Sequence, residues 1–385
     1  MRRALLVLMI VIAFVSGVRA QSGNVRPRRV NPPSDSTKAR TASNADAPRL
    51  DTSRAYALLQ QKQYEAALAE ARKIALAEPQ NAEAWKIVGF AELNLRRFKE
   101  AAESLQRAYE LQRAAGEEDA NTRDALAQAL VRSDQFDKAL PLLVAATTRP
   151  GAKPDAGLLY YRGLAEFRTG RTEEARRSFQ EVVKIEPRNS AALFYLGRIA
   201  YERGELDGAI VMLNRATQSD PRLAEAWTLL TIAYLRRASG SADQTQARAD
   251  YANAVRTGES LYNLKSDVPS ALLYGQALVY AGQYARAASV LERATAANSQ
   301  ADGTAFYLLG VAQSRLKNFP RAIVALERAA TLLANDAGVY RELGYAYEAT
   351  KQYAKALAAY ERGLSLAPND ADLKESVERV RPFAK

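Results

Sequence analysis

Three stretches of the chain share one pattern: KQYEAALAEARKIALAEPQN (62–81), GRTEEARRSFQEVVKIEPRN (170–189) and KQYAKALAAYERGLSLAPND (351–370). In each stretch an Ala is followed by apolar residues at three- and four-residue spacing, and then by Pro and Asn or Asp. Apolar residues at this spacing line one face of an α-helix. Because Pro lacks the N–H that a helix interior needs, it ends the helix. Each stretch is therefore predicted to be an amphipathic helix that stops near its Pro.

Further amphipathic helices are predicted between such stretches, in AWKIVGFAELNLRRF (84–98), ALFYLGRIAYERGEL (192–206) and VYRELGYAYEATKQY (339–353). The structural unit is thus a pair of helices joined by a short turn, and it recurs about every 34 residues. A fixed period of this length is typical of solenoid proteins. A single pair leaves one apolar face uncovered, so successive pairs must stack to form a core.

The pattern resembles the tetratricopeptide repeat (TPR) family, in which bulky residues occupy positions 4, 7, 11, 17 and 24, small residues positions 8, 20 and 27, and Pro position 32. Nine repeats follow, over residues 48–370, with starts at residues 48, 82, 120, 156, 190, 224, 268, 303 and 337. The resemblance implies an all-α fold, a right-handed α-solenoid of about nine helix-turn-helix repeats. The more polar residues 371–385 are expected to form a capping helix and tail.

Small residues recur where the two helices of a repeat should meet. Position 8 is Gly89, Gly163, Gly197, Gly275, Gly310 and Gly344, and otherwise Ala55, Ala127 and Thr231. Position 20 is Ala67, Ala101, Ala139, Ala175, Ala209, Ala247, Ala287, Ala322 and Ala356. Small side chains let two helices approach closely while bulky neighbours fill the groove beside them. We call this predicted line of contact the seam.

Glycines and prolines mark the expected helix ends. Gly170, Gly204 and Gly282, at position 15, suit a left-handed residue in the turn inside a repeat. Pro79, Pro187, Pro221 and Pro368 stand at position 32. Pro320 falls at the start of a second helix, where its missing donor costs little. Pro141 lies about one turn into a second helix, which it is expected to shift or kink.

The repeat spacing lengthens at three places, to 38 residues from 82 to 120, to 36 from 120 to 156 and to 44 from 224 to 268. We interpret SGSADQTQ (239–246) as a lengthened turn and TGESLYNLKSDVPS (257–270) as a longer loop between repeats. Ala247 reaches position 20 only with four extra residues between the helices. These insertions are expected to perturb the superhelix, with a potential break near 239–267.

The first twenty residues, MRRALLVLMIVIAFVSGVRA, have the pattern of a secretory signal peptide. Two arginines precede an apolar run over 4–15, and Val18 and Ala20 are small residues before a cut between Ala20 and Gln21. The run is shorter than the roughly 20 residues that span a bilayer. We expect export to the periplasm or outside the cell; the alternative is an uncleaved N-terminal anchor.

Residues 21–47 are expected to be a disordered basic linker, because Pro, Ser, Asn and Asp dominate and large apolar residues are almost absent. The net charge of the whole chain is +11, of which the first fifty residues contribute +7 and the remaining 335 only +4. A body this close to neutrality does not favour nucleic acid. Any contact with a membrane is expected to be transient or through an uncleaved leader.

The chain contains no Cys and no His. Disulfides, thiol nucleophiles, imidazole or thiolate metal sites and Ser-His-Asp triads are therefore excluded. There is also no Gly-rich phosphate loop and no nucleophile elbow. We expect no cofactor, no metal and no catalytic residue. Carboxylates such as Glu92, Glu166 and Glu202 leave acid–base catalysis open as a weaker alternative.

The family resemblance implies a concave groove lined by positions 2, 5, 9, 12 and 13 of the first helices, which takes a peptide or protein segment. The candidate partner-binding residues at these positions are Phe90, Tyr160, Phe167, Arg168, Phe194, Arg198, Tyr201, Arg236, Tyr280, Tyr307, Arg315, Arg341 and Tyr345. Aromatic rings and arginines together can stack on apolar side chains and pair with carboxylates. The alternative for each ring is ordinary packing between neighbouring first helices.

The sequence thus favours a non-enzymatic scaffold of the periplasm or cell envelope that binds a protein or peptide segment. An alternative is a membrane-tethered assembly factor whose basic N-terminal arm contacts anionic lipid or polysaccharide. Neither the identity of the partner nor the oligomeric state can be inferred from the sequence.

Overall fold

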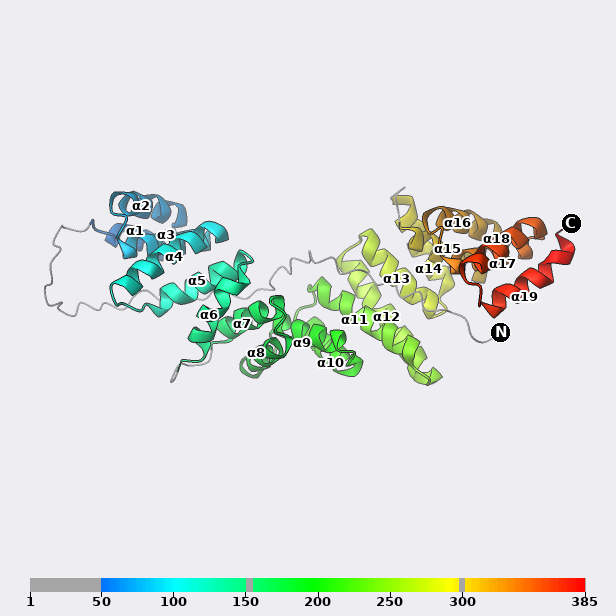
Figure 1. Ribbon diagram of the computed structural model, residues 1–385, viewed down its shortest axis with the longest axis horizontal. Coiled ribbons are helices and arrows are strands. Elements are labelled where there is room, and N and C mark those ends of the chain that lie inside the picture. Colours follow the sequence, from blue (N-terminus) through cyan, green and yellow to red (C-terminus); the bar gives the residue numbers. More distant parts are fainter. Residues whose placement is uncertain (1–49, 150–154, 298–301, 385) are drawn as a thin grey trace. The chain divides into compact units, whose positions relative to one another are not determined.

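The computed structural model describes residues 50–149, 155–297 and 302–384. Within these ranges the chain forms nineteen α-helices and one short 3-10 helix, and no strand. Successive helices pack against each other in pairs (Figure 1). The predicted all-α architecture of stacked helix pairs is confirmed for the described residues. The predicted signal peptide, its cleavage site at Ala20 and Gln21, and the linker 21–47 lie outside them.

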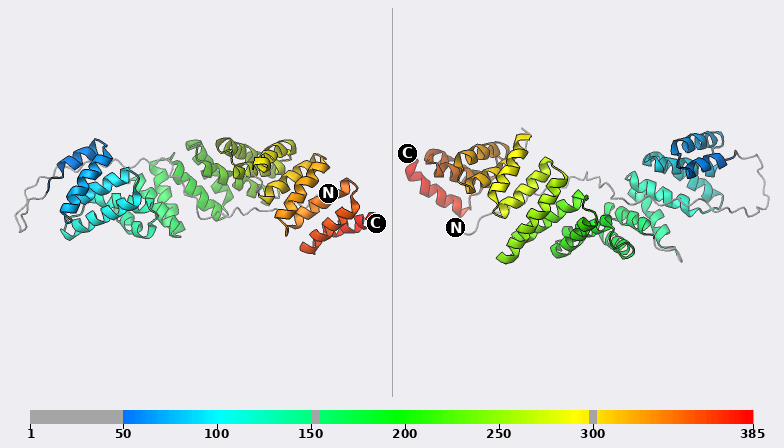
Figure 2. Two further views of the ribbon diagram at one scale, coloured as in Figure 1. Left: turned by 90° about the horizontal axis from the view of Figure 1, so that it is seen from above. Right: turned by 180° about the vertical axis from the view of Figure 1, so that it is seen from behind.

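The chain divides after Ile199, inside α9, into two compact units. The first unit contains α1 (Ser53–Gln60), α2 (Tyr64–Ala77), α3 (Ala82–Asn94), α4 (Phe98–Ala114), α5 (Ala120–Arg132), α6 (Phe136–Thr147), α7 (Ala156–Arg168), α8 (Thr172–Ile185) and most of α9 (Ser190–Glu202). The second unit continues with α10 (Leu206–Ser219), α11 (Ala224–Gly240), α12 (Gln244–Leu264), α13 (Val268–Tyr280), α14 (Tyr284–Ala297), α15 (Gly303–Arg315), α16 (Phe319–Leu332), α17 (Ala337–Ala349), α18 (Tyr353–Leu366), α19 (Ala371–Val380) and η1 (Arg381–Phe383). Within each unit the helices follow one another in chain order (Figure 2).

The first helices of repeats two to nine begin at the predicted residues, because an Asn or Asp usually precedes them. In α3, Asn81 accepts a hydrogen bond from the backbone N–H of Ala84 at 3.0 Å. Asp119, Asp155, Asn189, Asp267, Asp302, Asp336 and Asp370 act in the same way. Each such cap stabilises its helix by about 1 kcal/mol. The first repeat differs, since α1 begins only at Ser53, whose N–H is bound by Asp51 at 2.8 Å.

The seam forms as predicted. A Cβ added to Gly89 would lie 2.4 Å from Cγ of Leu105, and one added to Gly310 would lie 2.4 Å from Cγ of Leu326. The same clash recurs between Gly163 and Phe179, Gly275 and Leu291, and Gly344 and Tyr360. In every case the blocking residue is at position 24 of the same repeat. Eight of the nine predicted alanines at position 20 are fully buried, so the two helices of a repeat meet where both are small.

The turns inside the regular repeats pass through a left-handed residue at position 15. The three predicted glycines have positive φ, 79° at Gly170, 78° at Gly204 and 73° at Gly282. Five other turns place a side-chain-bearing residue there, namely Lys62, Arg96, Asp134, Lys317 and Lys351, with φ of 60° to 63°. Pro320 lies in the first turn of α16, as predicted. Pro141 lies inside α6, which still begins at the regular position 17.

At four of the described interfaces a polar contact that the repeat pattern does not predict joins successive repeats. Position 25 of one repeat is hydrogen-bonded to position 11 of the next. The pairs are Arg72 with Glu92 at 2.7 Å, Asn214 with Tyr234 at 3.0 Å, Glu292 with Gln313 at 2.8 Å, and Glu327 with Tyr347. The residue pair differs at each of these four interfaces, so no single residue type marks these two positions in the sequence.

The predicted loops around the insertion of repeat six are wrong. Helix α11 has 17 residues where 13 is usual, and α12 has 21 where 14 is usual. Residues 257–264 are therefore helical, and the turn between the two helices is as short as in other repeats. Because the hairpin is longer, Ala247 is only half-buried and does not reach the seam. Asp250 and Ala254, further along α12, are fully buried instead.

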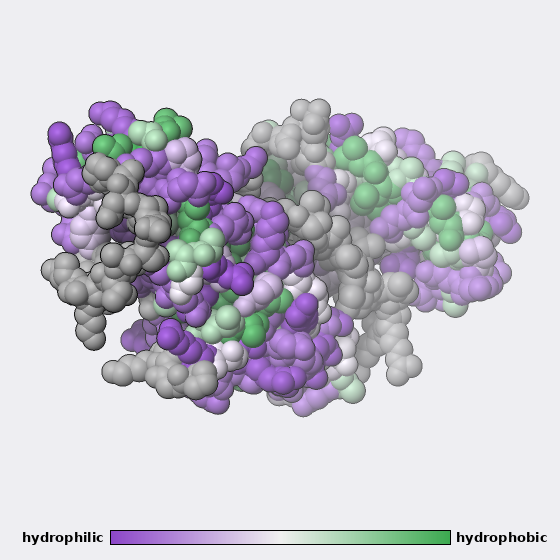
Figure 3. Space-filling view, turned by 60° about the vertical axis from the view of Figure 1, so that its left-hand side comes forward, coloured by the Kyte–Doolittle hydropathy of each residue, from purple (hydrophilic) through white to green (hydrophobic). Residues whose placement is uncertain are grey.

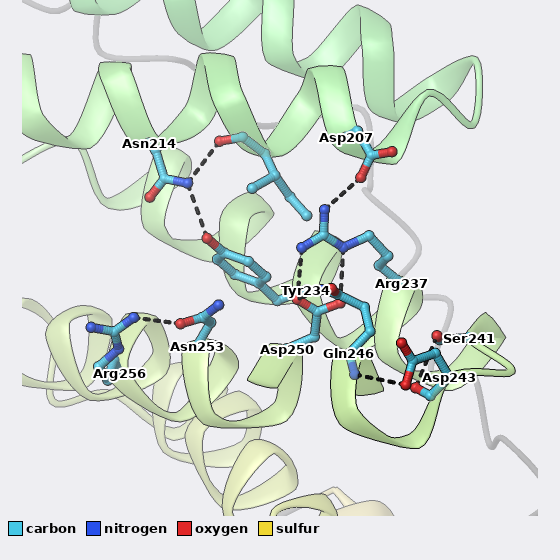
Figure 4. Close-up of polar contacts among 11 residues, drawn as sticks. Asp207, Asn214, Tyr234, Arg237, Ser241, Asp243, Gln246, Asp250, Asn253 and Arg256 are labelled. Atoms are coloured by element: carbon cyan, nitrogen blue, oxygen red, sulfur yellow. Dashed lines mark hydrogen bonds and ion pairs between the residues drawn. The ribbon is translucent and has the colours of Figure 1, made fainter. Parts of the chain in front are cut away.

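The long hairpin is tied by a bidentate ion pair (Figure 4). Arg237 of α11 donates to the two carboxylate oxygens of Asp250 at 2.8 Å and 2.7 Å, and Gln246 donates to Asp250 at 3.1 Å. A third donor, Nη1 of Arg237, reaches Asp207 of α10, whose side chain is 87 % exposed. These carboxylates raise the pKa of Arg237 above its usual value. The buried charge of Asp250 is thus matched by one guanidinium that spans three helices.

The C-terminal end is covered as predicted. Leu373, Val377 and Val380 of α19 are buried against α18 and its neighbours. On the exposed side, Arg379 donates to both oxygens of Glu348 at 3.0 Å, and Glu348 also accepts from Tyr360 at 2.8 Å. Helix α19 therefore closes the last apolar face of the array.

Replacing Gly310 by Ala should lower the free energy of unfolding by about 1–2 kcal/mol, because the new methyl group collides with buried Leu326 and overpacking outweighs the gain in helix propensity. Gly208 is the matched control, since the nearest atom to its added Cβ is 3.9 Å away. Gly208→Ala should stabilise by about 0.5 kcal/mol. Urea unfolding followed by circular dichroism measures both, and equal effects of the two variants would contradict the seam.

Replacing Arg237 by Met should destabilise the protein by about 3 kcal/mol, because a buried carboxylate loses its cation. The double variant Arg237→Met/Asp250→Leu should regain most of this loss, since no unpaired charge remains. Asp207→Asn is the control and should cost less than about 0.5 kcal/mol, because that carboxylate is exposed. Thermal and urea unfolding give the values; a double variant no more stable than Arg237→Met would refute the role of the pair.

Candidate functional site

In the first compact unit, arginines of the first helices lie on aromatic rings of the preceding repeat. The guanidinium carbon of Arg132 is 4.5 Å from the ring centroid of Phe98, and that of Arg168 is 4.7 Å from Phe136. Arg198 is 4.9 Å from the ring of Phe167. We call these three contacts the guanidinium–ring pairs. Each one joins two successive repeats.

Such a pair fixes a cation without neutralising it. Cation–π attraction is worth about 0.5–1 kcal/mol at exposed sites, and the flat ring holds one face of the guanidinium. The N–H groups of a guanidinium lie in its own plane, so the ring does not cover them. A first-helix face with several such pairs can therefore offer ordered positive charge next to apolar surface.

Three of the predicted groove aromatics are buried. Phe90, Tyr160 and Phe194 have exposed fractions of 2 %, 1 % and 6 %. Tyr160, Phe167 and Phe194 all contact Tyr195, with ring centroids 6.3 Å, 5.4 Å and 5.3 Å away. Burial raises the pKa of Tyr160 well above its usual value. In this structure these rings serve mainly as packing between neighbouring first helices, with Phe167 half-buried beneath Arg198.

In the second compact unit, Arg236 lies 5.1 Å from the ring of Tyr201. Tyr280 is half-buried, 5.8 Å from Tyr251. Tyr345 is 44 % exposed and contacts Phe319 edge-on at 6.0 Å.

The remaining predicted residues of this unit are held by their neighbours. Arg315 donates to both oxygens of Glu342 at 3.1 Å and 3.0 Å. Arg341 donates to Asp370 at 3.1 Å. Burial raises the pKa of Tyr307, and the charge of Arg341 acts in the opposite direction. Arg315 and Arg341 thus donate hydrogen bonds to carboxylates of the same chain. By contrast, Arg236 and the arginines of the three guanidinium–ring pairs lie on aromatic rings.

Two carboxylates considered for acid–base catalysis have structural partners. Glu92 accepts from Arg72 and Ser104, both at 2.7 Å. Glu166 accepts from Arg162 at 2.7 Å and from Ser178 at 2.6 Å. Both glutamates are buried, whereas Glu202 is exposed at the end of α9. Glu92 and Glu166 therefore link helices.

The described part of the chain holds no cluster of three or more acidic side chains that could bind a metal ion. None of the helices within the same ranges is long and apolar enough to cross a membrane. On the face drawn in Figure 3, hydrophilic residues dominate and apolar residues form small separate patches.

An open apolar hollow of about 880 Å³ lies in the second unit, between α14, α15 and α16. Phe306, Leu309, Pro320 and Val324 contribute its apolar lining, and Glu292 and Arg321 are among its charged lining residues. The lining residues of the first helix α15, Phe306, Leu309 and Gln313, stand at positions 4, 7 and 11, so the hollow uses none of the predicted groove positions.

The sequence analysis missed Arg132, Phe98 and Phe136. Arg132 stands at position 13, like Arg168 and Arg236, and both phenylalanines open a second helix at position 17. The available signal was a Phe followed by an Arg about one repeat later. Arg132 shares a candidate groove position with Arg168, whereas the two rings lie outside those positions because each belongs to the second helix of the preceding repeat.

Comparison with protein families agrees with this architecture. Models of the tetratricopeptide repeat match residues 52–118, 125–188, 166–233 and 337–370, which together make up more than half of the chain. A model described as "Anaphase-promoting complex, cyclosome, subunit 3" matches residues 247–329.

Similar proteins match only in part. The "BBSome complex member BBS4 homolog" of Drosophila melanogaster is 26 % identical over 218 residues, 56 % of this chain and 42 % of that protein. "Cellulose synthase 1 operon protein C" of Komagataeibacter xylinus is 30 % identical over 79 residues, 20 % of this chain and 6 % of that protein. The chain therefore spans less than half the length of these relatives.

Among solved structures, the C-terminal part of a TPR repeat-containing protein from Cytophaga hutchinsonii is similar, with 15 % identity and a TM-score of 0.49, covering 66 % of this chain and 99 % of that chain. The repeat models, the glycine and alanine seam and the paired helices all lead to one assignment. This chain belongs to the tetratricopeptide repeat family.

Proposed function

We propose that the protein is a non-enzymatic scaffold that binds a peptide or protein segment on its first-helix face. The observation that carries the proposal is the series of guanidinium–ring pairs, which place arginines beside aromatic rings at repeat intervals. Arg and aromatic side chains are enriched among the residues that dominate binding energy in protein interfaces. The Drosophila relative, named as a member of a complex, supports a protein partner.

The proposed location is the periplasm, the cell envelope or the exterior. It is supported by the sequence of residues 1–20, with its basic start, short apolar run and small residues before Gln21. In that setting the scaffold would assemble or tether an envelope complex. If the leader is retained, the same scaffold would be anchored in the membrane.

Charge reversal on the first-helix face should abolish partner capture. The test compares the wild type with the triple variant Arg168→Glu/Arg198→Glu/Arg236→Glu. We expect the variant to capture about one fifth or less of the partner that the wild type captures from a cell-envelope extract, because charge-assisted contacts are lost and repulsion is introduced. Quantitative mass spectrometry of the captured proteins measures this.

The matched control reverses three exposed cations of second helices and the loop that follows, Lys73→Glu/Lys184→Glu/Arg188→Glu. It carries the same change in net charge and should retain the partner. Circular dichroism and thermal unfolding confirm that both triple variants are folded. An identical set of captured proteins for the wild type and the Arg168 triple variant would rule out the proposed face.

Export predicts a shorter mature chain. After expression with the leader intact, the intact mass of the protein in the extracytoplasmic fraction should correspond to a chain that begins at Gln21. A variant with Arg2→Glu and Arg3→Glu should accumulate uncleaved in the cytoplasm, because a positive n-region is part of the signal. Full-length protein in the cytoplasm of wild-type cells would refute export, and full-length protein in the membrane fraction would favour the anchor.

A further inference from the structure

We propose that the apolar hollow between α14, α15 and α16 binds one face of an amphipathic, acidic α-helix of a partner protein. The hollow uses none of the predicted groove positions, so this binding surface is independent of the first-helix face. It lies entirely in the second compact unit.

The hollow has a floor from one helix and a wall from the next. Helix α15 packs on both α14 and α16 (Figure 1), and Phe306 and Leu309 of α15 line the hollow. The lining on α16 runs from Pro320 to Thr331, about 16 Å of helix at 1.5 Å per residue. The hollow is thus elongated along α16.

Val324 gives this surface an exposed apolar residue that most second helices lack. It stands at position 22 and is 69 % exposed. Small, polar or charged residues or Pro occupy position 22 in six other repeats, namely Ala69, Glu103, Pro141, Arg177, Ser289 and Ala358. Val211 shares the position and is 53 % exposed, but it does not line the hollow. An exposed apolar side chain beside an apolar concave surface is typical of an interaction site.

The lining favours a helix over an extended segment. Gln313, a polar residue of the floor, donates to Glu292 at 2.8 Å and accepts from Asn318 at 2.9 Å. An extended chain laid on Phe306 and Val324 would bury backbone N–H and C=O groups against apolar side chains, which opposes binding. A helix satisfies its backbone internally and presents only side chains to a groove.

The volume admits side chains but not the backbone of a helix. Spread over the length of the wall, about 880 Å³ corresponds to a width of roughly 7–8 Å. A helix with its side chains is about 10–12 Å across. Only the apolar face of a bound helix can therefore enter, while its opposite face stays in water. Such a helix carries bulky apolar residues at three- and four-residue spacing.

The charge around the hollow favours acidic residues on the polar face of that helix. Helices α14 and α16 together carry four arginines and two glutamates. Both glutamates, Glu292 and Glu327, already accept hydrogen bonds from position 11 of the next repeat. Arg321 is 74 % exposed, with an oxygen of Glu292 3.8 Å away. The surplus of positive charge attracts an acidic partner at long range.

The same charge disfavours a second copy of this chain as the occupant. In a two-fold contact each copy presents the same patch to the other, so the arginines of α14 and α16 would face arginines. A lipid surface is also a poorer occupant, because Leu309 on the floor is only 8 % exposed and a flat bilayer would not reach it. An acidic helix meets neither obstacle.

The first experiment places a fluorophore at the hollow. The chain contains no Cys, so one engineered cysteine labels one position. Thr331→Cys, which lines the hollow, carries an environment-sensitive dye. Ser365→Cys is the matched control, since both hydroxyls stand at position 29, are exposed and donate at 2.7 Å to the carbonyl three residues before.

The probe is a synthetic peptide of about 18 residues, five helical turns, with Leu on one face and Glu on the other. One comparison peptide has the same composition in an order that leaves no apolar face, and another has two central residues replaced by Pro. We expect a saturable blue shift of the dye at Thr331→Cys and none at Ser365→Cys. Both comparison peptides should bind at least about tenfold more weakly, because each lacks an apolar helix face.

Matched variants of the full chain then locate the site by anisotropy of the fluorescein-labelled peptide. Val324→Asp should weaken binding at least about tenfold, because a carboxylate would be buried against apolar side chains. Val211→Asp makes the same change at the same repeat position and should leave affinity within about twofold. Arg321→Gln should weaken binding about twofold at low salt and have no effect at about 0.5 M salt, where exposed charges are screened. Circular dichroism confirms that all three variants are folded.

Several outcomes overturn the proposal. No saturable binding of the Leu-Glu peptide, or equal binding of either comparison peptide, removes the helix site. Equal effects of Val324→Asp and Val211→Asp remove the hollow as its place. A dimer in sedimentation velocity that Val324→Asp abolishes would assign the hollow to a second copy, and phosphatidylglycerol vesicles that displace the peptide would assign it to lipid.

A last comparison separates this proposal from the proposed scaffold function. The triple variant Arg168→Glu/Arg198→Glu/Arg236→Glu should bind the Leu-Glu peptide within about twofold of the wild type at about 0.15 M salt, because distant exposed charges are largely screened. Failure of the capture experiment would therefore leave the helix site intact. Loss of the peptide in the triple variant, with Val324→Asp unaffected, would place the peptide on the first-helix face and refute the hollow.

Discussion

The structure depends on the close approach of two helices where neither has a large side chain. At Gly89 and Gly310 a single methyl group would come within 2.4 Å of the facing leucine. Nearly all the facing alanines at position 20 are fully buried. Close packing of this kind gains dispersion contacts that a wider gap forfeits. Because the same contact recurs in each regular repeat, it fixes the geometry of the helix pair and hence the surface presented by the first helices.

Much of the fold could be predicted because the local signals agree with one another. The first helices of repeats two to nine begin where the sequence indicated, and the reason is visible in the caps: Asn81 and its equivalents bind the backbone at each start. Repeat six is the exception. The composition of the inserted residues fits a longer helix as well as a longer loop, so only packing determines which of the two forms. The ion pair between Arg237 and the buried Asp250 stabilises the extra helical turns, and hydrophobic periodicity does not predict it.

The candidate site was less predictable, for a physical reason. Sequence periodicity says which face a residue occupies but not how deeply its ring is covered. Phe90 and Tyr160 share the face of Arg168, yet both are buried by neighbouring helices. Conversely, Phe98 and Phe136 belong to second helices and still meet arginines of the next repeat. Contacts between repeats depend on the stacking offset, which the pattern of one repeat does not contain.

The contacts within and between repeats also bear on how the chain folds. The seam joins residues sixteen apart, and the polar ties join residues about twenty apart, such as Arg72 and Glu92. Proteins whose contacts are this close in sequence fold quickly, because little loop-closure entropy opposes them. Each helix pair can pack on its neighbour once about forty further residues of the chain are available. Folding can therefore proceed repeat by repeat from one end of the array before the other end is folded.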